Sequence, residues 1–168
     1  VPGVIVWRVK LLQPFKRAER RLAGRREPKT DAVTSARMSR VRQRDTAPER
    51  VVRRALRDEG HRYRTRNRDL PGSPDIANRS RKWAIFVHGC YWHRHKNCKF
   101  ATTPRTNTAF WLAKFARNVE RDAAAYRELR RKGYQVLILW QCETERPERL
   151  IARLEVLRGL LAATPGRQ

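Results

Sequence analysis

Acidic residues are scarce in this 168-residue chain: 16 Asp and Glu stand against 40 Lys and Arg, a formal net charge of +24. Such an excess indicates a polyanionic partner, and nucleic acid is the partner we expect. The alternative is a protein that is basic only because its proteome is rich in arginine. Hydrophobic residues make up 40% of the chain and aromatic residues 8%, which excludes disorder of the whole chain.

Long apolar runs are also missing. No stretch approaches the roughly 20 residues that cross a bilayer, so we do not expect a membrane protein. The segment Val1–Leu12 carries Arg8 and Lys10 within its apolar part and no small-residue cleavage site follows, which argues against a secretory signal. Only three cysteines are present, an odd number that cannot form a closed disulfide framework. We therefore expect reduced thiols in a cytoplasm.

The length suits one folded domain with flanking segments. Residues 1–30 hold nine Lys or Arg and three Pro without a regular period, which predicts a basic, flexible N-terminal extension. It is either a tail without function or an arm that adds non-specific DNA affinity. We expect the domain at 31–163 and a short tail at 164–168.

Local patterns predict an α/β domain in which a mixed central sheet is flanked by helices. A capping box at Thr46 and Glu49 begins a helix that Gly60 ends. A strand over 134–140 is apolar throughout, which predicts burial on both faces. The remaining elements that we expect are strands at 61–66, 75–77 and 83–88, a long helix at 106–132 and a last helix at 147–163.

Cysteine and histidine gather in one short segment. Cys90, His95 and Cys98, with Cys142 from the end of a later strand, supply three thiolates and an imidazole, a common ligand set for structural zinc. The fold must then bring Cys142 beside the Cys90–Cys98 loop. His93 competes with His95 for the fourth position, and the alternative for the cysteines is that they are ordinary small buried residues.

Asp75 and His88 lie on two successive predicted strands. Their placement resembles metal-dependent nuclease cores, where an Asp and a residue of the neighbouring strand converge on a divalent cation; carboxylate oxygens suit Mg2+. A free imidazole titrates near neutrality, so a histidine here, His88 or His93, could activate a water or protonate a leaving oxygen. The alternative is a structural histidine near the zinc loop.

Several strings together resemble a known family, the very short patch repair endonucleases, over about Asp31 to Glu143. They are Met38-x6-Asp45-Thr46-x2-Glu49, Leu70-Pro71-Gly72-x-Pro74-Asp75, Phe86-x-His88-Gly89-Cys90-Tyr91-Trp92-His93, Phe110-Trp111 with Asn118-Val119-Glu120-Arg121-Asp122, and Trp140-x-Cys142-Glu143. The resemblance implies a restriction-endonuclease-like fold with a structural zinc. It also implies Mg2+-dependent nicking of duplex DNA 5′ to the thymine of a T:G mismatch, the lesion left when 5-methylcytosine deaminates.

The resemblance also implies roles for single residues. Asp75 would hold Mg2+ together with the backbone carbonyl of Val87, a position where many family members have Thr. His93 would be the water-activating base, steadied by Asp122. His88 would act at the reaction centre and Glu49 would complete it. Zinc would bind Cys90, His95, Cys98 and Cys142.

DNA recognition is expected to use aromatic side chains. Tyr91, Trp92 and Trp111 resemble the aromatics that wedge into the base stack beside the mismatch, with Met38 entering from the other groove. Unstacking is least costly where pairing is already defective, so a wedge favours a mismatch. The alternative for these residues, Trp111 above all, is core packing.

The partner implied is double-stranded DNA with a T:G mismatch, joined by mismatch-repair proteins. We expect a monomer in a bacterial cytoplasm, associated with the nucleoid when on DNA. Two other functions stay open: a nuclease of the same fold with another lesion or sequence specificity, and a non-catalytic, zinc-stabilised DNA-binding module.

Overall fold

The computed structural model describes residues 36, 39–40 and 44–162. The expected N-terminal extension at 1–30, Met38 and the expected tail at 164–168 lie outside the described residues. Within them, no helix is both long enough and apolar enough to cross a membrane. The described elements are α3 (Ala47–Asp58), β1 (Ile76–Asn78), β2 (Trp83–His88), α4 (Thr108–Arg131), β3 (Gln135–Trp140), α5 (Gln141–Thr144) and α6 (Pro147–Ala162).

The predicted mixed sheet is confirmed. Its three strands lie in the order β1-β2-β3, with β1 antiparallel and β3 parallel to the central strand. Ile76 pairs with Ile85, and His88 pairs with Trp140. The start of β1 and the ends of β2 and β3 therefore meet at one edge of the sheet, where Asp75, His88 and the residues after Trp140 come together.

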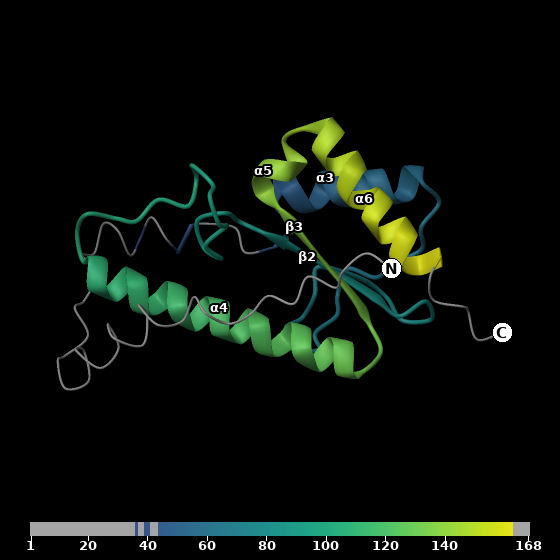
Figure 1. The fold of residues 1–168 in the computed structure, drawn as a ribbon, viewed down its shortest axis with the longest axis horizontal. Helices are drawn as coiled ribbons and strands as arrows, with labels where there is room; N and C mark the ends of the chain where they lie inside the picture. The colour runs from purple at the N-terminus through teal and green to yellow at the C-terminus, as the bar shows by residue number, and fades with distance from the viewer. Residues whose placement is uncertain (1–35, 37–38, 41–43, 163–168) are drawn as a thin grey trace.

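Helices cover both faces of the sheet. The long helix α4 lies on one side of β2 and β3, and α3, α5 and α6 lie on the other (Figure 1). Alternate residues of β2 serve the two layers. Trp83 and Ile85 join a core with α3 and α6, whereas Ala84 and Phe86 pack with Leu129 of α4. The same alternation turns His88 towards α4.

The helix boundaries follow local chemistry. Thr46 accepts a hydrogen bond from the amide of Glu49, whose carboxylate accepts one in return from the Thr46 amide, so the predicted capping box is present. Gly60 and Gly133, with φ of 75° and 80°, take the left-handed conformation that ends α3 and α4.

Two predictions about the strands are wrong. Residues 61–66 form no strand: Arg64 makes one isolated bridge with Ala77, because β1 is only three residues long and the chain turns at Asn67. The strand over 134–140 is not fully buried on both faces: within β3 only Leu137 and Leu139, which share one face, are buried, and Tyr134 is buried just before it. β3 is an edge strand of the described sheet, so helices cover it less completely than β2.

Candidate active site and metal centre

Asp75 comes directly before β1, on the face of the sheet that α4 covers. Its Oδ2 accepts a hydrogen bond from the amide of Val87 at 2.7 Å. Burial raises the pKa of Asp75 to about 6; the Val87 amide opposes this shift, the Glu49 carboxylate adds to it and His93 lowers it. Burial destabilises the ionised form of a carboxylate, and a nearby cation offsets that cost. Carboxylate oxygens are suitable ligands for a hard divalent ion such as Mg2+.

Two histidines and an aspartate lie beside Asp75. His93 Nδ1 is 2.5 Å from Asp122 Oδ2 on α4, and the His88 ring stacks on the His93 ring with centroids 3.7 Å apart. Burial lowers the pKa of His88 to about 3; His93 lowers it further and Asp122 opposes. His88 is therefore neutral near pH 7. Asp122 holds the Nδ1 proton of His93, which leaves His93 Nε2 free to accept a proton.

Glu49 reaches this cluster from α3. Its carboxylate accepts hydrogen bonds from the Asp45 amide at 3.0 Å and the Thr46 hydroxyl at 2.8 Å. It is 8% exposed and close enough to raise the pKa of Asp75. The same side chain thus caps α3 and adds negative charge to the cluster.

Tyr126 on α4 is a member of the cluster that the sequence did not single out. Its hydroxyl contacts His88 Nε2, and its ring packs edge-on against Phe86 at 5.0 Å. The signal for it is spacing: Tyr126 is four residues after Asp122, so both side chains leave the same face of α4.

The three cysteines and His95 converge at the same edge of the sheet. Their donor atoms all lie within 4.8 Å of one another. Cys90 and Cys142 each follow, by two residues, the paired residues His88 and Trp140, so the strand register brings them together. His95 Nδ1 lies 3.6 Å from Cys90 Sγ and 3.3 Å from Cys142 Sγ.

This donor set fits zinc. Tetrahedral zinc with Zn–S of about 2.3 Å and Zn–N of about 2.0 Å places sulfur and nitrogen roughly 3.5 Å apart, as in this cluster. Burial and the neighbouring thiols Cys90 and Cys98 raise the pKa of Cys142 to about 12, so a thiolate here calls for a cation. His95 joins the thiols, whereas His93 is engaged by Asp122.

The aromatic residues that we expect to contact DNA form one cluster, to which the Cys90–Cys98 loop contributes Tyr91 and Trp92. Tyr91 packs edge-on against Trp92 at 5.0 Å and Phe115 at 5.1 Å, and the Trp92 and Trp111 rings lie 6.0 Å apart. Tyr91 and Trp92 are partly exposed. Trp111 is 4% exposed, the burial that core packing requires.

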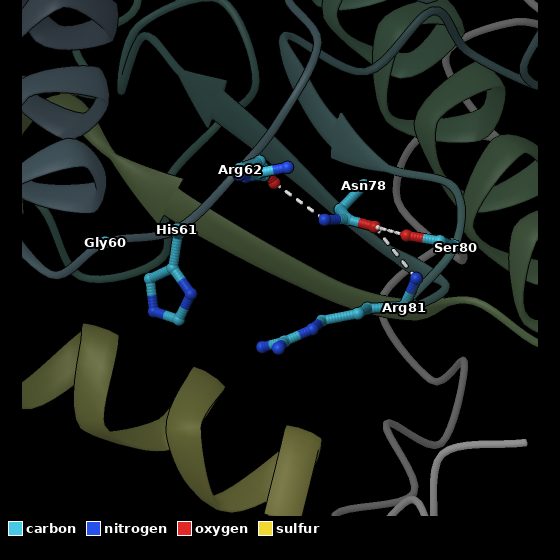
Figure 2. Close-up of a pocket in the computed structure, with 6 residues that line it drawn as sticks. All are labelled: Gly60, His61, Arg62, Asn78, Ser80 and Arg81. Carbon is cyan, nitrogen blue, oxygen red and sulfur yellow. Dashed lines mark hydrogen bonds between the residues drawn. The ribbon is translucent and has the colours of Figure 1, made fainter. Parts of the chain in front are cut away.

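A separate hollow lies at the other end of the β1–β2 hairpin. It encloses about 200 Å³ and is lined by Gly60, His61, Arg62, Asn78, Ser80 and Arg81. In Figure 2 the Arg81 side chain extends across it towards His61, while Asn78 bonds the Arg62 carbonyl, Ser80 and the Arg81 amide. The five steps of β2 separate this end of the hairpin from His88 by roughly 17 Å. The hollow is therefore not part of the Asp75 cluster.

Known proteins resemble the chain over this same region. A family model described as DNA mismatch endonuclease Vsr matches residues 28–99. The type II nicking enzyme V.XorIIP of Xanthomonas oryzae pv. oryzae is 40% identical over 117 residues, which are 70% of this chain and 85% of that protein. The DNA mismatch endonuclease Vsr of Escherichia coli K12 is 39% identical over 119 residues, 71% of this chain and 76% of that protein.

The type II nicking enzyme V.NmeAIP of Neisseria meningitidis is a further relative, 37% identical over 118 residues that make up 84% of its length. The family match includes Glu49, Asp75, His88 and His93, the residues that the fold gathers into one cluster. The chain therefore belongs to the Vsr DNA mismatch endonuclease family and is a DNA nicking endonuclease.

Proposed function

We propose that the chain is a Mg2+-dependent mismatch endonuclease that nicks duplex DNA 5′ to the thymine of a T:G mismatch arising from 5-methylcytosine deamination. The observation that carries the proposal is the joint placement of Asp75 and the His93–Asp122 pair at one sheet edge. The E. coli relative, named a DNA mismatch endonuclease, supports the specificity. The mixed sheet with helices on both faces is consistent with a restriction-endonuclease-like core.

In this proposal Asp75 and the Val87 carbonyl hold the Mg2+, which supplies positive charge for the scissile phosphate and an activated water. The Val87 amide orients Asp75 through its 2.7 Å hydrogen bond. Because that position contributes only backbone groups, Val in place of Thr leaves the site complete. Structural zinc is assigned to Cys90, His95, Cys98 and Cys142.

The protein's own groups move the proton. His93 Nε2 accepts a proton from the attacking water, and Asp122, bonded to His93 Nδ1, stabilises the imidazolium that forms. Glu49 adds a second carboxylate beside Asp75 for the cation. His88, neutral and stacked on His93, offers a hydrogen bond to the phosphate.

Recognition is assigned to Tyr91, Trp92 and Trp111, with Met38 from the opposite groove. Base–aromatic stacking contributes roughly 1–3 kcal/mol per base, which suffices to favour an easily unstacked mismatch. Tyr91 and Trp92 have exposed surface for this contact. Trp111 is buried beneath them and supports the wedge unless DNA opens the cluster.

For the whole chain we propose a catalytic domain at 31–163, a basic extension at 1–30 and a tail at 164–168. Free cysteines and bacterial relatives are consistent with the bacterial cytoplasm that we propose. A monomeric state and mismatch-repair proteins as further partners are part of the same proposal. A second candidate is a nicking enzyme of different lesion or sequence specificity. It is favoured by the relatives named type II nicking enzymes, which are as similar to the chain as the mismatch endonuclease is.

Matched duplexes that differ only in T:G against C:G test the proposal. We expect a single nick 5′ to the thymine in the T:G duplex with Mg2+, none in the C:G duplex, and none when EDTA removes the metal. Equal nicking of both duplexes would favour the second candidate.

A further inference from the structure

We propose that Tyr126 is a positioning residue: its hydroxyl holds His88 in the tautomer that carries the proton on Nδ1, so that Nδ1–H is the group presented at the active site. The tautomer follows from the contacts of the protein alone. Only the identity of what Nδ1–H meets, a DNA phosphate oxygen, rests on the proposed function.

The first step is the contact itself. The Tyr126 hydroxyl touches His88 Nε2, and no other hydrogen-bond partner of this hydroxyl occurs among the described residues. Burial raises the pKa of Tyr126 above its ordinary value, and the carboxylates of Asp122 and Asp75 raise it further. Tyr126 therefore keeps its proton. The hydroxyl hydrogen has one acceptor within the described structure, the lone pair of His88 Nε2. Asp122 Oδ2 lies 3.8 Å from the same nitrogen, beyond hydrogen-bond distance, and is engaged by His93 Nδ1.

A nitrogen that accepts a hydrogen bond cannot carry a proton itself. In a neutral imidazole, an unprotonated Nε2 requires a protonated Nδ1. The ring cannot easily exchange its two nitrogens by turning over. It is stacked on His93 at 3.7 Å and flanked by Phe86 at 5.8 Å and Trp140 at 5.6 Å.

The second step concerns the free nitrogen. Within the described part of the chain, His88 Nδ1 makes no hydrogen bond, and it is not among the enclosed atoms that lack a partner. Nδ1 is thus the ring nitrogen without a protein partner, and we infer that it faces the site of Asp75 and His93. As Nδ1–H it donates to an incoming phosphate oxygen; as a bare lone pair it would repel that oxygen.

Tyr126 and Asp122 therefore assign opposite roles to two stacked rings. Asp122 binds the Nδ1 proton of His93 and leaves a proton acceptor, whereas Tyr126 occupies Nε2 of His88 and leaves a proton donor. Both act from one face of α4, four residues apart. Removing one hydrogen-bond donor that is positioned before the reaction typically lowers the catalytic rate by a factor of roughly 10²–10³.

The direct test is the protonation pattern of the histidine ring in 15N-histidine-labelled full-length protein without DNA, read from long-range 1H–15N NMR spectra. His88→Gln assigns the His88 signals among the four histidines. We expect wild-type His88 to carry its proton on Nδ1, and Tyr126→Phe to shift it towards Nε2. Tyr63→Phe is the matched control: it removes a tyrosine hydroxyl that donates to the Arg53 carbonyl at 2.9 Å, away from the cluster.

Single-turnover nicking of a T:G duplex tests the consequence. We expect Tyr126→Phe to lower the rate roughly 10–100-fold with DNA affinity within about twofold of wild type, and Tyr63→Phe to change neither. A wild-type proton on Nε2 overturns the proposal, as does a Tyr126→Phe rate equal to wild type. The spectra involve no DNA, so a failure of the proposed T:G specificity would be seen separately.

Discussion

At the scale of single residues, the cluster depends on backbone positions that leave no room for a larger side chain. Gly72, three residues before Asp75, has φ of 72°, and a Cβ there would lie 2.5 Å from Ala125 Cβ of α4 and 3.2 Å from the Phe86 ring. Gly60 has a similar φ of 75°, but a Cβ there would meet nothing within 4 Å. Gly72 therefore sets how closely the loop before Asp75 approaches α4.

Gly72→Ala should destabilise the protein by about 2–5 kcal/mol, because the left-handed φ adds roughly 1–2 kcal/mol to an overpacking cost of about 1–3 kcal/mol. Gly60→Ala, the matched control, should cost only the roughly 1–2 kcal/mol due to φ. Urea unfolding measures both. Equal losses for the two variants would show that the loop does not press against α4.

At the scale of elements, the metal centre joins the ends of two strands. Cys90 follows β2 and Cys142 lies in α5 directly after β3, and their parallel register brings them together. Arg153 of α6 also contacts both elements. It donates a hydrogen bond to the Ile138 carbonyl of β3 and pairs with Glu143 of α5 at 3.5 Å. A metal bound by the four residues would fix the loop that carries Tyr91, Trp92 and His93.

Cys142→Ser should lose the metal and lower the melting temperature, because the binding energy of a structural zinc site is folding energy. Wild-type protein should contain about one zinc per chain by elemental analysis. Gln141→Ala, which alters the neighbouring α5 position, should retain it. Folded wild-type protein without zinc would refute the assignment.

The sequence predicted most of these elements because their signals are local. The capping box of α3, the glycines that end α3 and α4, and the apolar run of β2 each need only a few neighbouring residues. The wrong predictions depend on neighbours in space. Residues 61–66 alternate like a strand but face a three-residue partner, and β3 is apolar but lies at an edge.

The same limit applies to the site. Four cysteine and histidine ligands could be grouped from spacing and residue type, and the structure brings them together. The Tyr126–His88 contact joins residues 38 positions apart and carries no motif. To predict this contact, one must know where α4 crosses β2, and the periodicity of the sequence does not give that position.

At the scale of the whole molecule, the +24 charge is expected to supply affinity without sequence information, and in the proposed function the aromatic cluster would supply discrimination. Lys114 Nζ lies 5.3 Å from the Trp92 ring and adds positive charge at the cluster itself. The two contributions respond differently to salt. Added salt weakens binding to any duplex because it reduces the free energy gained from counterion release, whereas stacking depends little on ionic strength.

Trp92→Ala should therefore lower the affinity for T:G duplex about 10–100-fold relative to C:G duplex, the equivalent of roughly 1–3 kcal/mol of stacking. The slope of log Kd against log salt should stay the same for both duplexes. Phe100→Ala, which removes an aromatic that is 42% exposed on the following loop, is the control and should change neither value. A changed slope with an unchanged T:G preference would contradict the wedge.

Single-turnover nicking of the T:G duplex in Mg2+ by Asp75→Ala tests most directly whether Asp75 and its neighbours nick the mismatched strand. We expect nicking to be abolished while DNA binding, measured in parallel, is retained or tightened, since one carboxylate fewer faces the phosphates. Asp69→Ala is the control: this carboxylate lies on the same loop and pairs with Arg79 at 2.5 Å, so its loss should leave the rate unchanged. Wild-type nicking by Asp75→Ala would contradict the account.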